Sequence, residues 1–233
     1  MNKLKELSVF FPIYNEEKNI RTTFTKTLAV LPVVAEKFEI LLVNDGSSDR
    51  TGEVLEELAA GNPFVRVITH PVNRGYGAAL KSGLYGAAYE WVAFTDSDGQ
   101  FDFSEITRFI ETQTKTGADM VIGYYLHRAV PFYRKVNSFL WQFTVLLFFG
   151  LSVRDIDCGF KLLRKKVIET ISPLESERGA FISTEFLIKA KKSGFKMVEI
   201  GVHHYPATRP GTGANLNVIL KSFSDLFKLR RRL

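Results

Sequence analysis

Asp96 and Asp98 stand two residues apart, directly after an apolar run that is typical of a strand. Residues i and i+2 of extended backbone point the same way, so the two carboxylates share one side. Paired hard oxygen ligands suit Mg²⁺ or Mn²⁺, and such an ion commonly binds substrate phosphates as well. Gln100 could add a neutral oxygen ligand or a hydrogen bond. Asp-Ser-Asp-Gly is also good turn chemistry, so the pair by itself leaves a metal site and an Asx turn open.

Three other polar clusters also follow predicted strands. These clusters are Tyr14-Asn15-Glu16, Asn44-Asp45-Gly46-Ser47 and Asn73-Arg74-Gly75. The predicted strands, which are short and mostly apolar on both faces, cover 8–13, 39–43, 65–68, 91–95 and 120–122. Helical periods lie between them, at 20–31, 54–58, 75–88 and from 106 onward.

This alternation predicts an α/β fold with a doubly wound, mostly parallel sheet and helices on both faces. Ligands of such sheets bind beyond the carboxyl ends of the strands. The four clusters therefore converge on one edge, and this convergence favours the metal site at Asp96 and Asp98 over the turn alone.

Gly75-Tyr76-Gly77 superficially resembles a dinucleotide-binding fingerprint. However, it follows the third predicted strand rather than the first, and Leu80 occupies the third glycine position. The motif instead predicts close packing of the following helix on the sheet.

The second half of the chain is less regular. We predict a long apolar helix at 132–151, a strand at 159–164, a helix at 183–192, and one or two strands at 196–205. A loop at 209–215 precedes a basic amphipathic helix at 217–233, with Ile219, Phe223, Leu226 and Phe227 on one side. We divide the chain into a catalytic domain, 1–215, and a C-terminal helix, 216–233, that is a candidate for the membrane interface. The alternatives are a frayed basic tail and, for 132–151, an ordinary buried helix.

Composition narrows the classes of partner. The formal net charge is +6 over 233 residues, which favours anionic partners such as nucleotides or phospholipid surfaces. No nucleic-acid-binding module is visible, so we expect no nucleic-acid partner. Cys158 is the single cysteine, which excludes an intrachain disulfide. The longest apolar stretch, 139–151, is shorter than the roughly 20 residues needed to span a bilayer, and we expect neither a spanning helix nor a signal peptide.

Four motifs in order carry a resemblance to a known family. They are Phe11-Pro12-Ile13-Tyr14-Asn15-Glu16-Glu17, Val43-Asn44-Asp45-Gly46-Ser47-Ser48-Asp49, Asn73-Arg74-Gly75 and Asp96-Ser97-Asp98-Gly99-Gln100. Together they resemble family 2 glycosyltransferases with the GT-A fold, over about residues 7 to 210. The segments 155–161 and 203–206 resemble the polyprenyl-phosphate hexosyltransferases, which include the dolichol-phosphate mannose and dolichol-phosphate glucose synthases.

The resemblance implies a role for each matching residue. Asp96, Asp98 and Gln100 would hold Mg²⁺ or Mn²⁺ and the diphosphate. Either Asp155 or Asp157 would act as base or orienter, with Asp155 favoured by the family pattern. The residues that would bind the nucleotide sugar are Pro12, Tyr14, Glu16, Asp45, Asp96 and Arg209. Those that would bind the acceptor phosphate are Arg128, Arg134 and Ser138.

Two positions depart from the family pattern. Relatives often carry two aspartates where this chain has Asn44-Asp45, so one of the two carboxylates remains for nucleoside binding. Relatives often carry a lysine in the loop after the position of Arg209, and Gly211-Thr212-Gly213 contains none. The resemblance therefore does not extend to a second cation for the diphosphate.

The implied reaction is transfer of a hexosyl group, with inversion, from a nucleotide-diphosphate sugar of the GDP-mannose or UDP-glucose class to a polyprenyl phosphate. We expect a peripheral protein at the cytoplasmic face of a membrane, alone or with a small membrane-anchoring partner. Transfer to a glycan hydroxyl, or non-catalytic binding of nucleotide sugars, are the alternatives.

Overall fold

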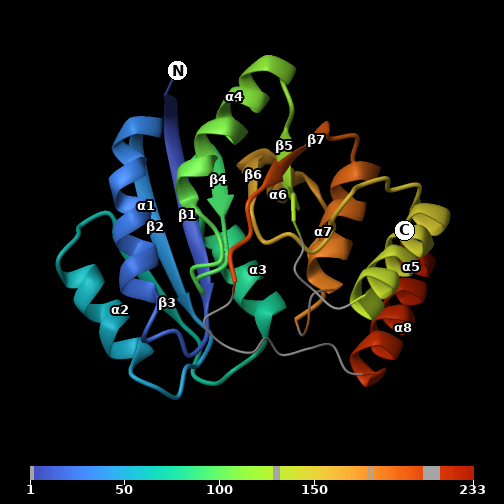
Figure 1. The fold of residues 1–233 in the computed structure, drawn as a ribbon, viewed down its shortest axis with the longest axis horizontal. Coiled ribbons are helices and arrows are strands. Elements are labelled where there is room, and N and C mark those ends of the chain that lie inside the picture. Colours follow the sequence, from blue (N-terminus) through green and yellow to red (C-terminus); the bar gives the residue numbers. More distant parts are fainter. Residues whose placement is uncertain (1–2, 128–131, 178, 180, 207–215) are drawn as a thin grey trace.

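The computed structural model describes residues 3–127, 132–177, 179, 181–206 and 216–233 (Figure 1), without the side chains of 132–135 and 216–221. Its strands are β1 Leu4–Ile13, β2 Ala35–Asn44, β3 Val65–Thr69, β4 Trp91–Phe94, β5 Met120–Tyr125, β6 Lys161–Arg164 and β7 Met197–Val202. Its helices are α1 Ile20–Val34, α2 Thr51–Ala60, α3 Tyr76–Gly86, α4 Ile106–Thr116, α5 Phe132–Phe149, α6 Lys165–Thr170, α7 Phe181–Lys192 and α8 Leu216–Arg232, with a 3₁₀ turn at Phe103–Glu105.

The described strands form one sheet in the order β3-β2-β1-β4-β6-β5-β7. Every pairing is parallel except those of β6, which runs antiparallel to both β4 and β5. Lys161 at the start of β6 pairs with Phe94 at the end of β4. The segment that enters β6 therefore arrives at the edge where the parallel strands end.

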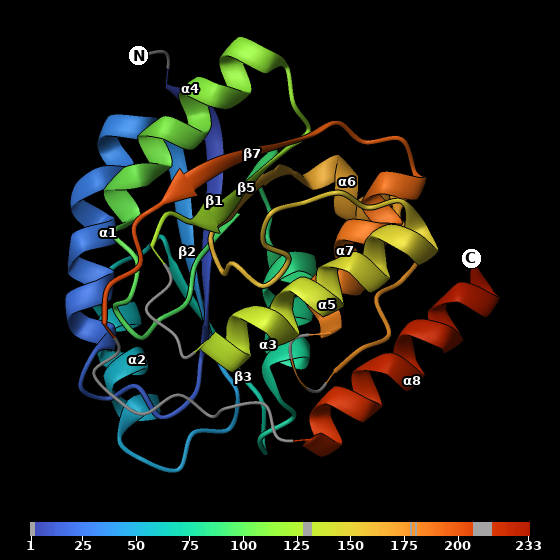
Figure 2. The same ribbon diagram turned by 45° about the vertical axis from the view of Figure 1, so that its right-hand side comes forward.

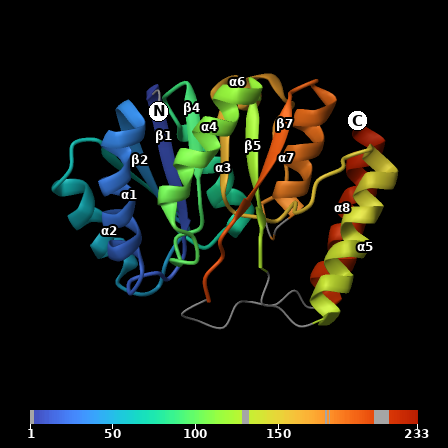
Figure 3. The same cartoon turned by 45° about the horizontal axis from the view of Figure 1, so that its top comes forward.

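Helices cover both faces of the sheet, because consecutive residues of a buried strand point to opposite sides. Phe11 joins the hydrophobic cluster under α1, α2 and α4, whereas the neighbouring Phe10 joins the cluster under α3, α6 and α7. Figure 3 shows the two helical layers on either side of the strands. The doubly wound, mostly parallel α/β sheet predicted from the sequence is confirmed.

Helices α5 and α8 lie side by side at one end of the molecule, outside α7 (Figures 1, 2 and 3). The rings of Phe148 and Phe227 meet edge to face with centroids 5.3 Å apart. Leu226 and Leu229 of α8 are buried in the cluster under α7. Much of the apolar side of α8 therefore packs against protein. Within the described residues, no helix is both long and apolar enough to cross a bilayer.

Two features differ from the sequence prediction. The short helix α6, directly after β6, was not predicted. Gly77 packs against a loop and not against the sheet, because a Cβ there would collide with the backbone of Glu177. The glycine of α3 that allows close packing on the sheet is Gly83, which faces the ring of Phe10. The packing prediction for Gly77 is therefore wrong in its partner, since local sequence does not show which helix face meets the sheet.

Candidate active site at the carboxyl edge of the sheet

Asp96 and Asp98 lie just beyond the end of β4. The Tyr76 hydroxyl, at the start of α3, donates a hydrogen bond to Asp96 Oδ1 at 3.2 Å. Burial, followed by the charge of Asp98, raises the pKa of Asp96 to about 7. Asp98 Oδ1 accepts a hydrogen bond from the Gln100 amide at 3.0 Å, across Gly99 with a φ of 79°. The Asx turn that the sequence left open as an alternative is present, in the same loop as the carboxylate pair.

The loop that carries this pair is anchored on both sides. Ser97 Oγ donates to the carbonyl of Pro12 in β1 at 2.9 Å, and Thr23 Oγ1 of α1 donates to the Ser97 carbonyl at 3.2 Å. The side-chain amide of Gln100 donates to the Tyr205 carbonyl at 2.9 Å, and the Tyr205 amide donates to the Gln100 carbonyl at 2.9 Å. Pro12 thus contributes its backbone to the site, and Gln100 ties the loop to the segment after β7.

Asp45, only 2% exposed, organises the loop after β3. Its carboxylate accepts from the backbone amides of Arg74 at 3.0 Å and Gly75 at 2.7 Å, and from Asn73 Nδ2 at 3.2 Å. Its fourth partner is His70, whose Nδ1 lies 2.7 Å from Oδ1. A carboxylate held by four protein groups shapes the Asn73-Arg74-Gly75 loop. Its predicted contact with a nucleoside stays a prediction.

Tyr14 and Glu16 lie in a loop that is joined to the one after β2. Asn15 adopts a left-handed backbone with a φ of 56°, and its amide donates to Ser47 Oγ at 3.0 Å. The Glu16 amide donates to Thr51 Oγ1 at 2.8 Å. Tyr14 projects into solvent, and the charge of Glu16 adds to burial and to Asp98 in raising the pKa of Asp96. Both residues therefore lie at the edge where the sequence placed them.

A cavity of about 230 Å³ opens between the end of β5, the start of α5 and the loop before β6. Asp155 lines it and is buried, and Ser138 lines it from α5. The predicted base and one predicted acceptor-phosphate residue thus share one cavity. Asp157 lies next to Asp155, because its backbone amide donates a hydrogen bond to Asp155 Oδ1 at 3.0 Å. The other lining residues are Tyr124, Tyr125, Phe139, Gln142 and Arg154.

Three predicted cationic positions are not placed. Arg128 and Arg209 lie outside the described residues, and Arg134 lies in α5 without a described side chain. Their predicted contacts with the acceptor phosphate and the donor diphosphate stay predictions.

The residues at the end of β4 fit a hard divalent cation in their chemistry. Among the described side chains, no group of three or more His, Cys, Asp or Glu is arranged to hold a metal. Burial and the charge of Asp98 nevertheless raise the pKa of Asp96, so the two carboxylates repel each other when both are ionised. A cation between the two would relieve that repulsion, and carboxylates with an amide oxygen are the ligands that Mg²⁺ and Mn²⁺ prefer.

Sequence reasoning missed three residues that the structure brings to this edge: Tyr76, His70 and Arg154. Tyr76 and His70 flank the Asn73-Arg74-Gly75 cluster in the chain. This neighbourhood is the sequence feature that could have identified them as site residues. Arg154 precedes Asp155 and places its guanidinium 4.6 Å from the centroid of the Tyr124 ring, beside the cavity. It is a described cation in the region where Arg128 and Arg134 are predicted to bind the acceptor phosphate.

Comparison with known proteins agrees with this arrangement. The profile of Glycosyl transferase family 2 matches residues 8–172. The chain is 30% identical over 235 residues to dolichyl-phosphate beta-glucosyltransferase ALG5A of Trichomonas vaginalis, covering 96% of this chain and 72% of the relative. It is 32% identical over 206 residues to undecaprenyl-phosphate 4-deoxy-4-formamido-L-arabinose transferase of Pectobacterium carotovorum, covering 88% of this chain but only 61% of the relative.

A solved structure shows the same fold. Glucosyl-3-phosphoglycerate synthase from Mycobacterium tuberculosis, crystallised with Mn²⁺, uridine diphosphate and phosphoglyceric acid, superposes with a TM-score of 0.70. The superposition covers 97% of this chain and 78% of the synthase chain, at 19% identity. The likeness therefore concerns the fold alone. With the family profile spanning most of the chain and the carboxylate pair at the sheet edge, this protein belongs to glycosyltransferase family 2, has the GT-A fold and is a glycosyltransferase.

Proposed function

We propose that this glycosyltransferase moves a hexosyl group, with inversion, from a nucleotide-diphosphate sugar to a polyprenyl phosphate. The cavity that holds Asp155 and Ser138 carries this proposal. It opens beside Phe139, which belongs to the exposed apolar face of α5. A cavity lined in part by Ser138, Arg154 and Asp155, at the edge of an apolar face, suits an acceptor that has a phosphate head and a prenyl tail. The curated relatives named for dolichyl and undecaprenyl phosphate support the same acceptor class.

The donor would bind at the carboxyl edge, over the loops that follow β1, β2 and β4. Tyr14, Glu16 and Asp45 would contact the nucleoside, and the Asp45 carboxylate also shapes the adjoining loop. Asp96, Asp98 and Gln100 would hold Mg²⁺ or Mn²⁺. Such an ion neutralises the negative charge that builds on a diphosphate leaving group.

The transfer forms a bond between an acceptor phosphate oxygen and the anomeric carbon, and it breaks the bond from that carbon to the nucleoside diphosphate. The acceptor phosphate is already anionic near neutral pH, so it needs no strong base. Asp155 then orients the acceptor and takes any remaining proton. Most of the rate arises from positioning and from electrostatic stabilisation of the leaving group.

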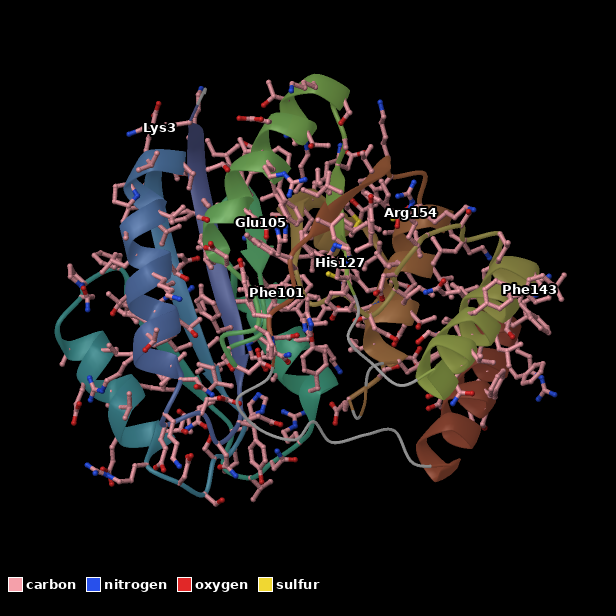
Figure 4. All side chains as sticks on the ribbon, in the orientation of Figure 1. Lys3, Phe101, Glu105, His127, Phe143 and Arg154 are labelled. Carbon is pink, nitrogen blue, oxygen red and sulfur yellow. The ribbon has the colours of Figure 1, made fainter. Side chains whose placement is uncertain are left out.

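The apolar face of α5 would lie in the surface of an anionic membrane. Phe139 and Leu147 are 66% and 71% exposed, and Phe143 belongs to the same face (Figure 4). The adjoining end of α8 carries the exposed basic residues 230–232. Basic residues near anionic lipid contribute about 1 kcal/mol each, and apolar burial adds to this. The cytoplasmic leaflet is the anionic one, so we propose a peripheral protein at that face, with or without a small anchoring partner.

A transfer assay tests the proposal. Radiolabelled UDP- and GDP-hexoses are paired with undecaprenyl phosphate, dolichyl phosphate and a soluble glycan acceptor, with and without Mn²⁺. We expect label in a prenyl-linked product only when the metal is present. Label in the glycan alone would identify the alternative reaction at a hydroxyl group. Donor binding without transfer to any acceptor would identify a binding protein instead.

Asp98→Ala is the matched variant for this assay. We expect it to abolish transfer and to leave the far-ultraviolet circular dichroism unchanged, since Asp98 lies in a loop beyond β4. Normal turnover of this variant at saturating donor and metal would contradict the assigned role of the carboxylate pair.

A further inference from the structure

Lys161 is a buried lysine at the carboxyl edge of the sheet, on an interior strand. It begins β6, pairs with Phe94 of β4 and Ile122 of β5, and is only 1% exposed. A fully buried ammonium is costly unless it is hydrogen-bonded and near opposite charge. The buried Lys161 ammonium therefore needs hydrogen-bond acceptors and negative charges nearby.

Its hydrogen-bond partners belong to the loop that enters β6. Lys161 Nζ donates to the carbonyl oxygen of Cys158 and lies 3.5 Å from that of Ile156. The Phe94 ring is also a neighbour, with its centroid 5.5 Å from Nζ. The side chain thus folds back and holds the segment 155–160 from beneath.

Three carboxylates act electrostatically on this ammonium. Burial has the largest effect and lowers the pKa of Lys161, whereas Cys158 and then Asp155, Asp157 and Asp96 favour its charged form. In return, Lys161 opposes the rise in the pKa of Asp96. Lys161 therefore interacts electrostatically with both the predicted base and Asp96.

The same loop touches Asp96 directly. A Cβ at Gly159 would overlap the Asp96 carboxylate, so the loop backbone lies against that side chain. The distance between Asp155 and Asp96 consequently depends on how the segment 155–160 is held.

We propose that Lys161 is a positioning residue of the transfer site, which fixes the loop 155–160 so that Asp155 faces the acceptor cavity while the loop backbone lies against Asp96. This inference rests on the proposed transfer reaction for its effect on rate. Its structural part, the holding of the loop, does not depend on that reaction.

Lys161→Met removes the ammonium and keeps a long side chain, and Lys161→Arg keeps the charge. Lys166→Met, on the exposed side of α6, is the matched control. In the transfer assay we expect Lys161→Met to lower kcat by about 10²-fold, because misplacement of a reacting group by about 1 Å has an effect of that size. The KM for the nucleotide sugar should change little, and Lys161→Arg should restore part of the rate.

Combination with Asp155→Asn separates positioning from general destabilisation. If Lys161 acts through Asp155, the double variant loses little more than either single variant. Multiplicative losses, or an unchanged kcat in a folded Lys161→Met protein, would overturn the proposal.

Hydrogen–deuterium exchange tests the loop independently of activity. We expect faster exchange of the amides of 155–160 in Lys161→Met, and no change in Lys166→Met. Lys161→Gln, which keeps a neutral donor, provides the same readouts if the methionine variant does not fold. Absence of transfer by the wild-type chain would refute the proposed function alone, whereas unchanged exchange would refute the role of Lys161.

Discussion

Tyr76 donates its hydroxyl to Asp96 Oδ1 at 3.2 Å, and this contact joins the start of α3 to the end of β4. Burial and the charge of Asp96 raise the pKa of Tyr76 well above its ordinary value, so the phenol stays protonated and keeps donating. The bond favours the ionised form of Asp96, against burial and the charge of Asp98.

Tyr76→Phe should therefore weaken metal binding in a pH-dependent way. Without the donor, the pKa of Asp96 rises above about 7, and a larger fraction of the carboxyl is protonated at neutral pH. We expect Mn²⁺ affinity, measured by electron paramagnetic resonance, to fall several-fold at about pH 6.5 and to recover at about pH 8.5. Tyr89→Phe, far from the carboxylates, is the control. Equal affinity of wild type and Tyr76→Phe at the lower pH would contradict the role given to this hydrogen bond.

The raised pKa of Asp96 also predicts how the free energy of unfolding of the metal-free protein depends on pH. Its pKa is 3.8 in an unperturbed chain and about 7 in the fold. Between these values the folded state holds a proton that the unfolded state releases, so the contribution of Asp96 to the free energy of unfolding falls as pH rises. We expect the urea concentration at the unfolding midpoint, measured in EDTA, to fall as the pH is raised from about 5 to about 8. Asp96→Asn should flatten this trend. Saturating Mn²⁺ should oppose it, because the ion binds the ionised form. A trend of equal slope in Asp96→Asn would assign it to other groups.

Arg154→Ala should weaken acceptor binding more than turnover. The guanidinium stacks on Tyr124 beside the cavity that holds Asp155 and Ser138, where it can pair with a phosphate. We expect the KM for polyprenyl phosphate to rise by about tenfold, as for loss of one charge-assisted hydrogen bond, with kcat less affected. Arg164→Ala is a matched control, since Arg164 stacks over Trp91 at the opposite edge of the sheet. An equal rise in KM for both variants would remove the specific role of Arg154.

Membrane binding should depend on the outer face of α5. Replacing Phe139, Phe143 and Leu147 together with serine should abolish flotation with vesicles that contain phosphatidylglycerol. Serine at the exposed Val33 and Val72, far from α5, should leave flotation unchanged. Deletion after Asn215 removes the basic helix α8 and should also weaken binding. Because Leu226 and Leu229 are buried, however, the deletion requires a check of folding. Undiminished flotation of the triple variant would exclude α5 as the contact.

Much of the fold followed from local pattern. Strands buried on both faces, alternating with helical periods, predicted the parallel sheet, and the rule that parallel strands end at one edge was enough to bring Asp45, Asp96 and Asp98 together. Only six residues form α6, too few for a helical period to stand out. The packing partner of Gly77 was missed because packing between distant segments leaves little trace in local sequence.

The sequence by itself thus determined the type of sheet, the positions of its polar clusters and the family to which they belong, because those depend on the local order of residue types. The tertiary structure decided which side chains meet. The antiparallel insertion of β6 brings Lys161 and the loop of Asp155 to the carboxyl edge, and the packing of α3 places Tyr76 on Asp96. Such contacts join residues far apart in the chain, and their pKa values follow from burial and neighbouring charge, which the fold alone creates.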